Sequence, residues 1–148
     1  LKFGARHAFE SAAAAIQPII DATYGRMAQK TIITVGEMKG EYVEEAMILT
    51  AKAGRCVVTA MGHLTDMDVK LNLFLMAMLQ KDLQGNIFGG GNARQDVPNL
   101  LAMYKAGKLN IADMITRQYR LDQINEGYTD MLEGRNIRGV IRYTDADR

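Results

Sequence analysis

The chain has 148 residues, and its 18 Lys and Arg side chains nearly balance its 17 Asp and Glu side chains, which leaves a formal charge of +1. This balance gives no electrostatic reason to expect nucleic acid or an anionic membrane as a partner. Hydrophobic residues make up 48% of the sequence, as in an ordinary globular domain, and the longest apolar run, at residues 71–79, is far shorter than the roughly 20 residues of a membrane span.

The cellular compartment is predicted from the cysteine content. Cys56 is the single cysteine, and the start of the sequence lacks the layout of a signal peptide, so we predict a cytoplasmic protein. The sequence begins at Leu1 without an initiator methionine, and we therefore expect a piece of a longer protein.

The N-terminal residues predict a short strand and then a helix. The strand covers residues 7–9. An alanine run with apolar residues at helical spacing follows, and it predicts a helix with Ser11 as N-cap and Gly25 as its stop. Pro18 must lie near the first turns of this helix or kink it.

Residues 31–61 predict a βαβ unit. Two short apolar, β-branched runs, at residues 31–35 and 56–61, are typical of strands that are buried on both faces of a parallel sheet. Between them, residues 41–53 carry apolar side chains at helical spacing, with Gly54 as the predicted C-cap. We expect a right-handed crossover.

The second half of the chain predicts three helices and two short strands. The first helix, at residues 71–81, is rich in Met and apolar nearly all round, which predicts cover on more than one side. After a strand at residues 86–88, three consecutive glycines form either a flexible linker, or a tight turn or close backbone approach to a ligand. The remaining elements are a helix from Asp96 to Gly107 with Leu100, Leu101 and Tyr104 buried, a helix with Leu121, Ile124, Tyr128, Met131 and Leu132 buried, and a strand at residues 137–141.

The residues that could carry catalysis or hold a metal are few. Cys56 lies in an apolar strand without a second cysteine, which favours a structural thiol. His63 with Asp66 and Asp68 matches no metal motif, and a solvated loop is favoured. Ser11, the single serine, is better used as a helix cap. We therefore predict no catalytic residue and no metal ligand in this chain.

A ligand edge is predicted from the ends of the strands. The sequence lacks the glycine fingerprints that cradle phosphates, but ligands of open parallel sheets bind beyond the carboxyl ends of the strands. The small residues at those ends serve either a ligand or merely tight turns. Arg138, inside the last short strand, either points to solvent or reaches a specific anion.

The C-terminal part contains five distinctive blocks: Gly85-Asn86-Ile87-Phe88-Gly89-Gly90, Asp96-Val97-Pro98-Asn99-Leu100, Ile115-Thr116, Ile124-Asn125-Glu126-Gly127-Tyr128 and Gly134-Arg135-Asn136-Ile137-Arg138. In order and spacing these blocks resemble the zinc-dependent medium-chain alcohol dehydrogenases. The upstream half fits as well. Residues 89–94 and 115–119 look most like the actinobacterial branch that keeps its nicotinamide cofactor tightly bound during turnover.

The resemblance implies an α/β fold that is incomplete. The chain would be the later part of a Rossmann-type, doubly wound parallel sheet, plus the C-terminal helix and strand segment that packs on an absent catalytic domain. Residues 1–88 would form a partial dinucleotide-binding domain without its first two strands, and residues 89–148 a segment of the catalytic domain. Those two missing strands would separate the strand at residues 7–9 from the strand at residues 31–35.

The resemblance also implies a set of cofactor-binding residues. Val35 and Gly36 would pass near the adenosine side of the cofactor, and Thr59, Ala60 and Met61 would flank the nicotinamide. Backbone groups of Asn86, Ile87 and Phe88 would hold the carboxamide, and Arg138 would pair with the pyrophosphate.

The function implied for the longer parent protein is hydride transfer between an alcohol and NAD, with zinc bound by residues outside this chain. The chain alone is predicted to be inactive. Its expected partners are the alcohol or aldehyde substrate and a second copy, which would pair through the edge at residues 86–88. The alternatives are a non-catalytic nucleotide-binding or oligomerisation module, and part of a zinc-free quinone or enoyl reductase of the same superfamily. NADP in place of NAD stays open, because the discriminating residue follows a missing strand.

Overall fold

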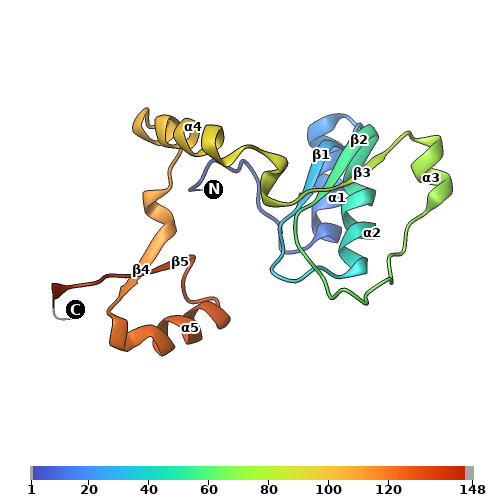
Figure 1. Cartoon of the computed structure of the whole chain (residues 1–148). Coiled ribbons are helices and arrows are strands. Elements are labelled where there is room, and N and C mark those ends of the chain that lie inside the picture. Colours follow the sequence, from blue (N-terminus) through green and yellow to red (C-terminus); the bar gives the residue numbers. More distant parts are fainter. Residues whose placement is uncertain (1, 146–148) are drawn as a thin grey trace. The chain divides into compact units, whose positions relative to one another are not determined.

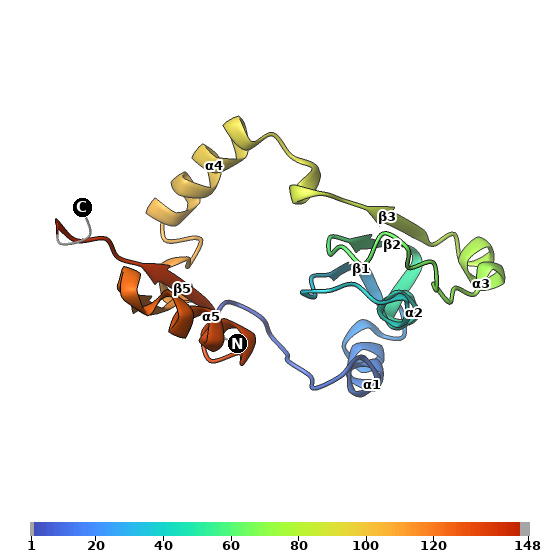
Figure 2. The same ribbon diagram turned by 60° about the horizontal axis from the view of Figure 1, so that its bottom comes forward.

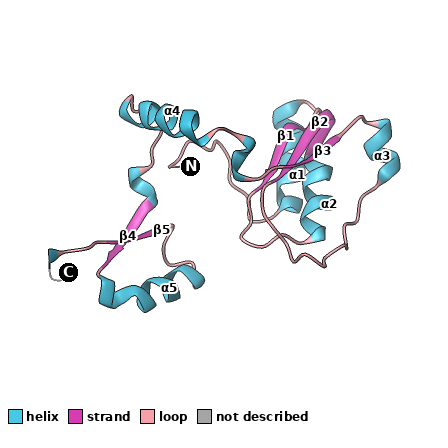
Figure 3. Cartoon of the chain, in the orientation of Figure 1, coloured by secondary structure: helices cyan, strands magenta, loops and turns pink. Residues whose placement is uncertain are grey.

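The computed structural model describes residues 2–145 and divides into two compact units, Leu1–Gly91 and Asn92–Arg148. Unit 1 contains a three-stranded parallel sheet and unit 2 a two-stranded parallel sheet, each with helices (Figures 1 and 3). The predicted α/β class with parallel strands is confirmed. The boundary after Gly91 lies close to the predicted one after residue 88, while the assignment of the two parts to domains of a larger enzyme stays a prediction.

The strand predicted at residues 7–9 is wrong for this structure. Residues 2–10 form turns, bends and irregular chain without a strand. A strand needs a neighbour with which its backbone groups form hydrogen bonds. The resemblance places two further strands between this segment and β1 (Ala28–Ile33), and within residues 2–145 this segment has no strand to pair with.

Helix α1 (Ala12–Thr23) begins and ends as predicted. Ser11 is the N-cap, and its hydroxyl accepts a backbone N–H of the first turn at 3.1 Å. The chain leaves the helix through Tyr24 and Gly25, which have φ values of 53° and 78°. Pro18 lies inside the helix beyond its first turn.

The sheet of unit 1 has its three strands in the order β1-β2-β3, all parallel: β1 (Ala28–Ile33), β2 (Thr50–Val58) and β3 (Asp82–Gly85). Ile33 is paired with Val58, and Val58 is paired with Gly85. The last residues of the three strands therefore lie side by side at one edge of the sheet.

The other three strands predicted in unit 1 all end later than the observed strands. The predicted ends are residues 35, 61 and 88, whereas the strands end at residues 33, 58 and 85. The prediction at residues 86–88 misses the body of β3, which lies in a polar segment. Apolar, β-branched residues indicate that a segment is buried, but a strand ends where the chain leaves the ladder of backbone hydrogen bonds. The apolar run therefore does not mark the end of the strand.

Helix α2 (Gly40–Leu49) ends earlier than the predicted residue 53, and Gly54 is not its C-cap. Thr50, whose backbone is extended, starts β2 instead, and its buried hydroxyl donates to the Ala46 carbonyl at 2.7 Å and lies 2.7 Å from the Thr31 hydroxyl of β1. This contact ties the end of the helix to two strands at once.

The core of unit 1 lies on one face of the sheet. Ile33, Val43, Met47 and Cys56 form its buried cluster, with the Cys56 thiol free and fully buried. Helix α2 packs on the sheet and α1 packs on α2, on the same side (Figure 2). The prediction of strands buried on both faces is wrong, since Ile32 of β1 is 62% exposed.

The segment between β2 and the glycine run at residues 89–91 differs from its prediction. Helix α3 (Leu73–Met78) is shorter than predicted, and it is not covered on several sides, because Leu73 and Phe74 are each 70% exposed. The glycine run takes the tight-turn alternative: η1 (Phe88–Gly90) is a 3-10 turn in which Gly89 and Gly90 have φ values of 78° and 63°.

Unit 2 pairs two strands that are separated by a helix. Its elements are α4 (Ala93–Lys105), η2 (Ala112–Met114), β4 (Ile115–Tyr119), η3 (Leu121–Gln123), α5 (Ile124–Leu132) and β5 (Arg138–Ile141). Strand β4, which the sequence patterns did not predict, pairs in parallel with β5. Helix α4 starts after the N-cap Asn92 and not at Asp96.

The predicted buried faces of both long helices in unit 2 are exposed. Leu100, Leu101 and Tyr104 of α4 are all more than 40% exposed, and the apolar positions of the last helix, Leu121, Ile124, Tyr128, Met131 and Leu132, are exposed too. The face of α5 that is packed carries Gly127 and Asp130. Periodicity identifies an apolar face, but it does not say whether this chain contains the surface that covers it.

The close contacts around Gly54 predict a destabilising substitution. In Gly54→Ala the new Cβ would lie 2.9 Å from Thr50 Cγ2 and from the Ala51 carbonyl oxygen, so we expect the free energy of unfolding to fall by about 1–3 kcal/mol in urea denaturation. Gly85→Ala is the matched control, because its Cβ would meet nothing within 4 Å, and its change should stay within about 0.5 kcal/mol. Equal losses in the two variants would contradict this account of Gly54.

Candidate functional site

The carboxyl edge of the β1-β2-β3 sheet gathers eight of the nine predicted site residues. Val35 and Gly36 follow β1, Thr59, Ala60 and Met61 follow β2, and Asn86, Ile87 and Phe88 follow β3. Because the strands are parallel and their last residues are paired, these three short segments leave the sheet at the same edge. Ligands of open parallel sheets bind at such an edge.

Hydrogen bonds fix the segments after β1 and β2 to one another. The Thr59 hydroxyl and N–H both donate to the Ile33 carbonyl, at 2.8 and 3.3 Å. Further along, the Met38 N–H donates to the Met61 carbonyl at 3.1 Å. The side chain of Met61 is 74% exposed, so this segment presents an apolar surface beside a backbone that is already held.

Asn86 is the most informative residue at this edge. Its N–H donates to the Val58 carbonyl at 2.9 Å, which extends the β2-β3 ladder by one bond. Its side-chain oxygen Oδ1 is buried and has no hydrogen-bond partner among the described residues. Buried polar groups nearly always have partners, so an orphaned acceptor is a position where a ligand N–H would fit. Phe88, two residues on, is 95% exposed and has a φ of 48°.

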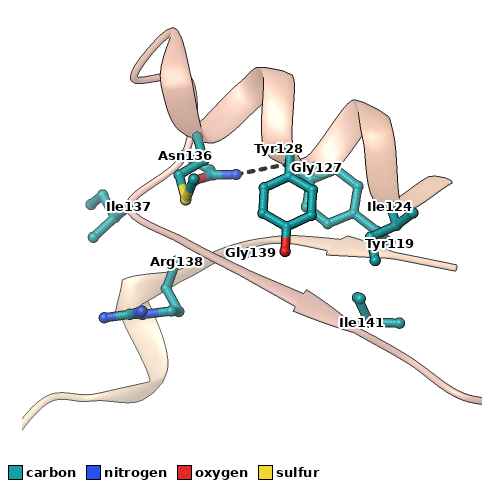
Figure 4. Close-up of a pocket in the computed structure, with 10 residues that line it drawn as sticks. Tyr119, Ile124, Gly127, Tyr128, Asn136, Ile137, Arg138, Gly139 and Ile141 are labelled. Atoms are coloured by element: carbon teal, nitrogen blue, oxygen red, sulfur yellow. Dashed lines mark hydrogen bonds between the residues drawn. The ribbon is translucent and has the colours of Figure 1, made fainter. Parts of the chain in front are cut away.

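Arg138, the ninth predicted site residue, is the first residue of β5 in unit 2. It borders a cavity of about 250 Å³ between α5 and β5 that Tyr119, Tyr128 and Asn136 also line. Figure 4 shows the Arg138 side chain extending away from the Tyr128 ring. The Arg138 side chain is exposed, and no carboxylate within residues 2–145 forms an ion pair with it.

A buried carboxylate organises the rest of unit 2. Asp130 of α5 is 2% exposed, and its Oδ2 accepts the Tyr119 hydroxyl at 2.7 Å. Arg135 Nε donates to Asp130 Oδ1 at 2.7 Å, and a guanidinium nitrogen of Arg117 lies 3.1 Å from Oδ2. Asn136 Nδ2 donates to the Tyr119 oxygen at 2.9 Å, the bond drawn in Figure 4. One carboxylate therefore links α5, β4 and the segment that leads into β5.

The pKa values of Asp130 and Tyr119 are shifted in opposite directions. The Tyr119 hydroxyl bond, and after it the Arg135 bond, holds the pKa of Asp130 below the ordinary range of an aspartate. Burial, followed by the hydrogen bond to the carboxylate, raises the pKa of Tyr119. Both shifts keep the aspartate charged and the tyrosine protonated, which is the state that the hydrogen bond requires.

Sequence reasoning did not identify Tyr119, Asp130 or Asn136. The available signal is the position of Asp130, an acidic residue between Tyr128 and Met131 on a helix that otherwise reads as apolar. Such a residue needs a partner if it is buried. Its partner lies on a strand that was not predicted, so the pairing is visible only in the fold.

Metal ligation finds no support in the described part of the chain. Within residues 2–145 no group of three or more His, Cys, Asp and Glu side chains is arranged to hold a metal ion. His63 lies 3.3 Å from the carboxylate of Glu37, and both side chains are exposed. The helices of residues 2–145 are all too short or too polar to cross a lipid bilayer.

Comparison with known proteins gives matches along the whole chain. A family model described as zinc-binding dehydrogenase matches residues 1–106. Alcohol dehydrogenase B of Mycobacterium tuberculosis is 59% identical over 148 residues, all of this chain and 40% of that protein. The NDMA-dependent alcohol dehydrogenase of Amycolatopsis methanolica is 36% identical over 144 residues, 97% of this chain and 39% of that protein. The chain thus spans about two fifths of the length of these relatives, and the predicted resemblance is confirmed.

Solved structures share the fold at low sequence identity. An alcohol dehydrogenase zinc-binding domain protein from Burkholderia ambifaria matches with a TM-score of 0.84 at 17% identity, over 95% of this chain and 37% of that chain. Benzyl alcohol dehydrogenase from Acinetobacter calcoaceticus matches with a TM-score of 0.79 at 18% identity, over 88% of this chain and 34% of that chain. These likenesses confirm the fold class.

The lowered pKa of Asp130 predicts an acid-sensitive unit 2. A group whose pKa is lower in the folded state stabilises the fold above its unfolded pKa, about 4 for Asp, and loses that contribution as the pH falls through the folded value. We expect Asp130→Asn to lower the melting temperature at neutral pH and to flatten its decline in acid.

The matched control is Asp122→Asn, the same change at an exposed carboxylate paired with Arg120. Exposed pairs contribute little to stability, so this variant should keep most of the wild-type decline below about pH 4. An unchanged acid limb in Asp130→Asn would contradict the assignment.

Proposed function

The chain belongs to the zinc-binding dehydrogenase family, and from that membership we propose that it is the C-terminal part of an alcohol dehydrogenase that transfers hydride between an alcohol and NAD. The observation that carries the proposal is the carboxyl edge of the sheet. There, three strand ends meet in register beside the buried, unpartnered Oδ1 of Asn86.

The residues at this edge fit a nicotinamide dinucleotide. An orphaned amide oxygen can accept an N–H from a carboxamide, and we propose that backbone groups of Asn86, Ile87 and Phe88 hold the same group. Thr59, Ala60 and Met61 would flank the nicotinamide ring, and Val35 and Gly36 would lie near the adenosine side. When bound, the cofactor supplies the carbon that accepts or returns the hydride.

We assign Arg138 to the phosphates of the cofactor. Its guanidinium is exposed and lacks an acidic partner among the described residues, so its charge remains available. A guanidinium offers two parallel donors to a phosphate and stays charged at any working pH.

Zinc would be held outside this chain. The chain spans about two fifths of its relatives, and the described residues contain no cluster suited to the metal. The proposal is therefore that the longer polypeptide supplies the zinc ligands and most of the alcohol or aldehyde pocket. Within that longer polypeptide these 148 residues would contribute cofactor binding, and alone they would not catalyse the reaction.

Two finer features are proposed from the relatives and from the sheet. The resemblance of residues 89–94 and 115–119 to the branch that keeps its nicotinamide cofactor tightly bound supports a cofactor that stays bound between turnovers, and one relative is named an NDMA-dependent alcohol dehydrogenase. Strand β3 is the last strand of its sheet, and its outer edge is a place where a second copy could pair. The dimer edge predicted at residues 86–88 would then begin within Asp82–Gly85. From the single cysteine we further propose a cytoplasmic location.

The activity test uses the full-length protein that contains this chain. We expect it to contain zinc and nicotinamide dinucleotide after purification, measured by metal analysis and by the absorbance of nucleotide released on denaturation. It should oxidise an alcohol, with NDMA as acceptor if the cofactor stays bound.

The outcomes separate the candidate functions. Nucleotide without zinc, together with reduction of a quinone or an enoyl substrate, would favour the zinc-free reductase. Nucleotide or self-association without any turnover would favour the non-catalytic module. Neither zinc nor nucleotide in a folded full-length protein would contradict the proposed function.

Replacing Arg138 tests its proposed role directly. We expect Arg138→Ala in the full-length protein to weaken NAD binding by roughly 1.5–3 kcal/mol, or about 10- to 150-fold in Kd, as for a lost hydrogen bond to a charged group. Arg94→Ala removes the same charge from α4 and should leave the Kd within about two-fold. An unchanged Kd in Arg138→Ala would overturn the phosphate assignment.

A further inference from the structure

We propose that the buried hydrogen-bond chain Asp130–Tyr119–Asn136 is a positioning device that holds Arg138 ready for the phosphate groups of the cofactor. The inference rests on the proposed role of Arg138, and it adds three residues to which the family comparisons give no part. None of the three is proposed to touch the cofactor.

The strand that carries Arg138 needs support from outside its own ladder. Strand β5 has four residues and one partner, β4, and two-stranded ribbons are marginal by themselves. Hydrogen bonds fasten it on both sides of Arg138. Before it, the Ile137 N–H donates to Thr116 Oγ1 at 2.9 Å, and after the strand the Arg142 N–H donates to the Tyr119 carbonyl at 2.8 Å.

Tyr119 is the centre of this support. A Cβ on Gly139, the residue after Arg138, would lie 2.8 Å from Tyr119 Cε2, so the ring packs directly against that backbone. The Tyr119 oxygen also accepts from Asn136 Nδ2, two residues before Arg138. One side chain therefore contacts the β5 segment on both sides of the arginine.

Asp130 holds Tyr119 in this place. It is 2% exposed, and it accepts the Tyr119 hydroxyl at 2.7 Å while Arg135 and Arg117 supply opposite charge at 2.7 and 3.1 Å. Those two arginines supply the ion-pair partners of Asp130, and Arg138 is not among them. The arrangement thus fixes the backbone under Arg138 and leaves the guanidinium of Arg138 for an external anion.

The physical benefit is preorganisation. A strand already held in its binding conformation loses less conformational entropy when an anion binds. The smaller entropy loss makes binding tighter. If the chain Asp130–Tyr119–Asn136 acts in this way, its effect on the cofactor must pass through Arg138. A role limited to general stability would act on the cofactor whether or not the arginine is present.

A double-mutant cycle on the full-length protein separates these two cases. The variants are Tyr119→Phe, Arg138→Ala and their combination, and the measurement is the Kd of NADH from fluorescence titration of cofactor-free protein. We expect Tyr119→Phe to raise the Kd about five-fold, and to change it less than about two-fold when Arg138 is already alanine. Tyr104→Phe, a hydroxyl deletion on α4, is the control and should leave the Kd unchanged.

A second variant guards against misfolding. Asn136→Ala leaves the Tyr119–Asp130 bond in place and removes only the link to β5, so it should fold if Tyr119→Phe does not, with melting temperature as the check. It should show the same dependence on Arg138.

Each outcome of the cycle is decisive. Equal effects of Tyr119→Phe or Asn136→Ala with and without Arg138, or no effect in either background, would overturn the positioning role and leave the proposed function intact. A Kd that does not respond to Arg138→Ala would remove the role of Arg138 itself, and the positioning role with it. Dehydrogenase activity would still test the wider proposal.

Discussion

The parallel pairing of β2 with both of its neighbours is the constraint on which the candidate site depends. It sets Ile33, Val58 and Gly85 side by side, so three segments that are distant in sequence leave the sheet at one edge. Two contacts hold the β1-β2 pairing at its two ends. The Thr31 and Thr50 hydroxyls bond near the start of the strands, and Thr59 bonds to the Ile33 carbonyl where the strands end. A shift in this register would separate the backbone of Asn86 from the Thr59 segment.

Unit 2 uses a buried charge where unit 1 uses an apolar cluster. Replacing a buried ion network with apolar residues is often neutral or stabilising, so such a network is weak evidence for stability by itself. The network instead fixes the relative positions of these elements, because Asp130 bonds to specific donors on β4 and in the segment before β5. This specificity suits a segment whose proposed task is to present one arginine.

The differences between prediction and structure have two physical origins. Strand ends were placed too late because apolar residues such as Val35 and Ile87 continue past the last ladder bond, and burial and pairing are separate properties. Buried faces were overestimated because Leu100, Tyr128 and Ile32 belong to apolar surfaces without cover among the described residues. The sequence motifs were enough to predict the family and the segments of the candidate edge, because the order and spacing of residue types can be read from the sequence alone.

By itself, the sequence determined the α/β class, the order of the main helices and strands, the N-cap Ser11, the glycine stop at Gly25, and the segments that form the candidate edge. These features depend on local chemistry: periodicity, capping and turn residues. Only the tertiary structure decided the orphaned oxygen of Asn86, the β4-β5 pair and the Asp130–Tyr119–Asn136 chain. Each of these features depends on contacts between residues that are distant in sequence, and such contacts are visible only in the folded structure.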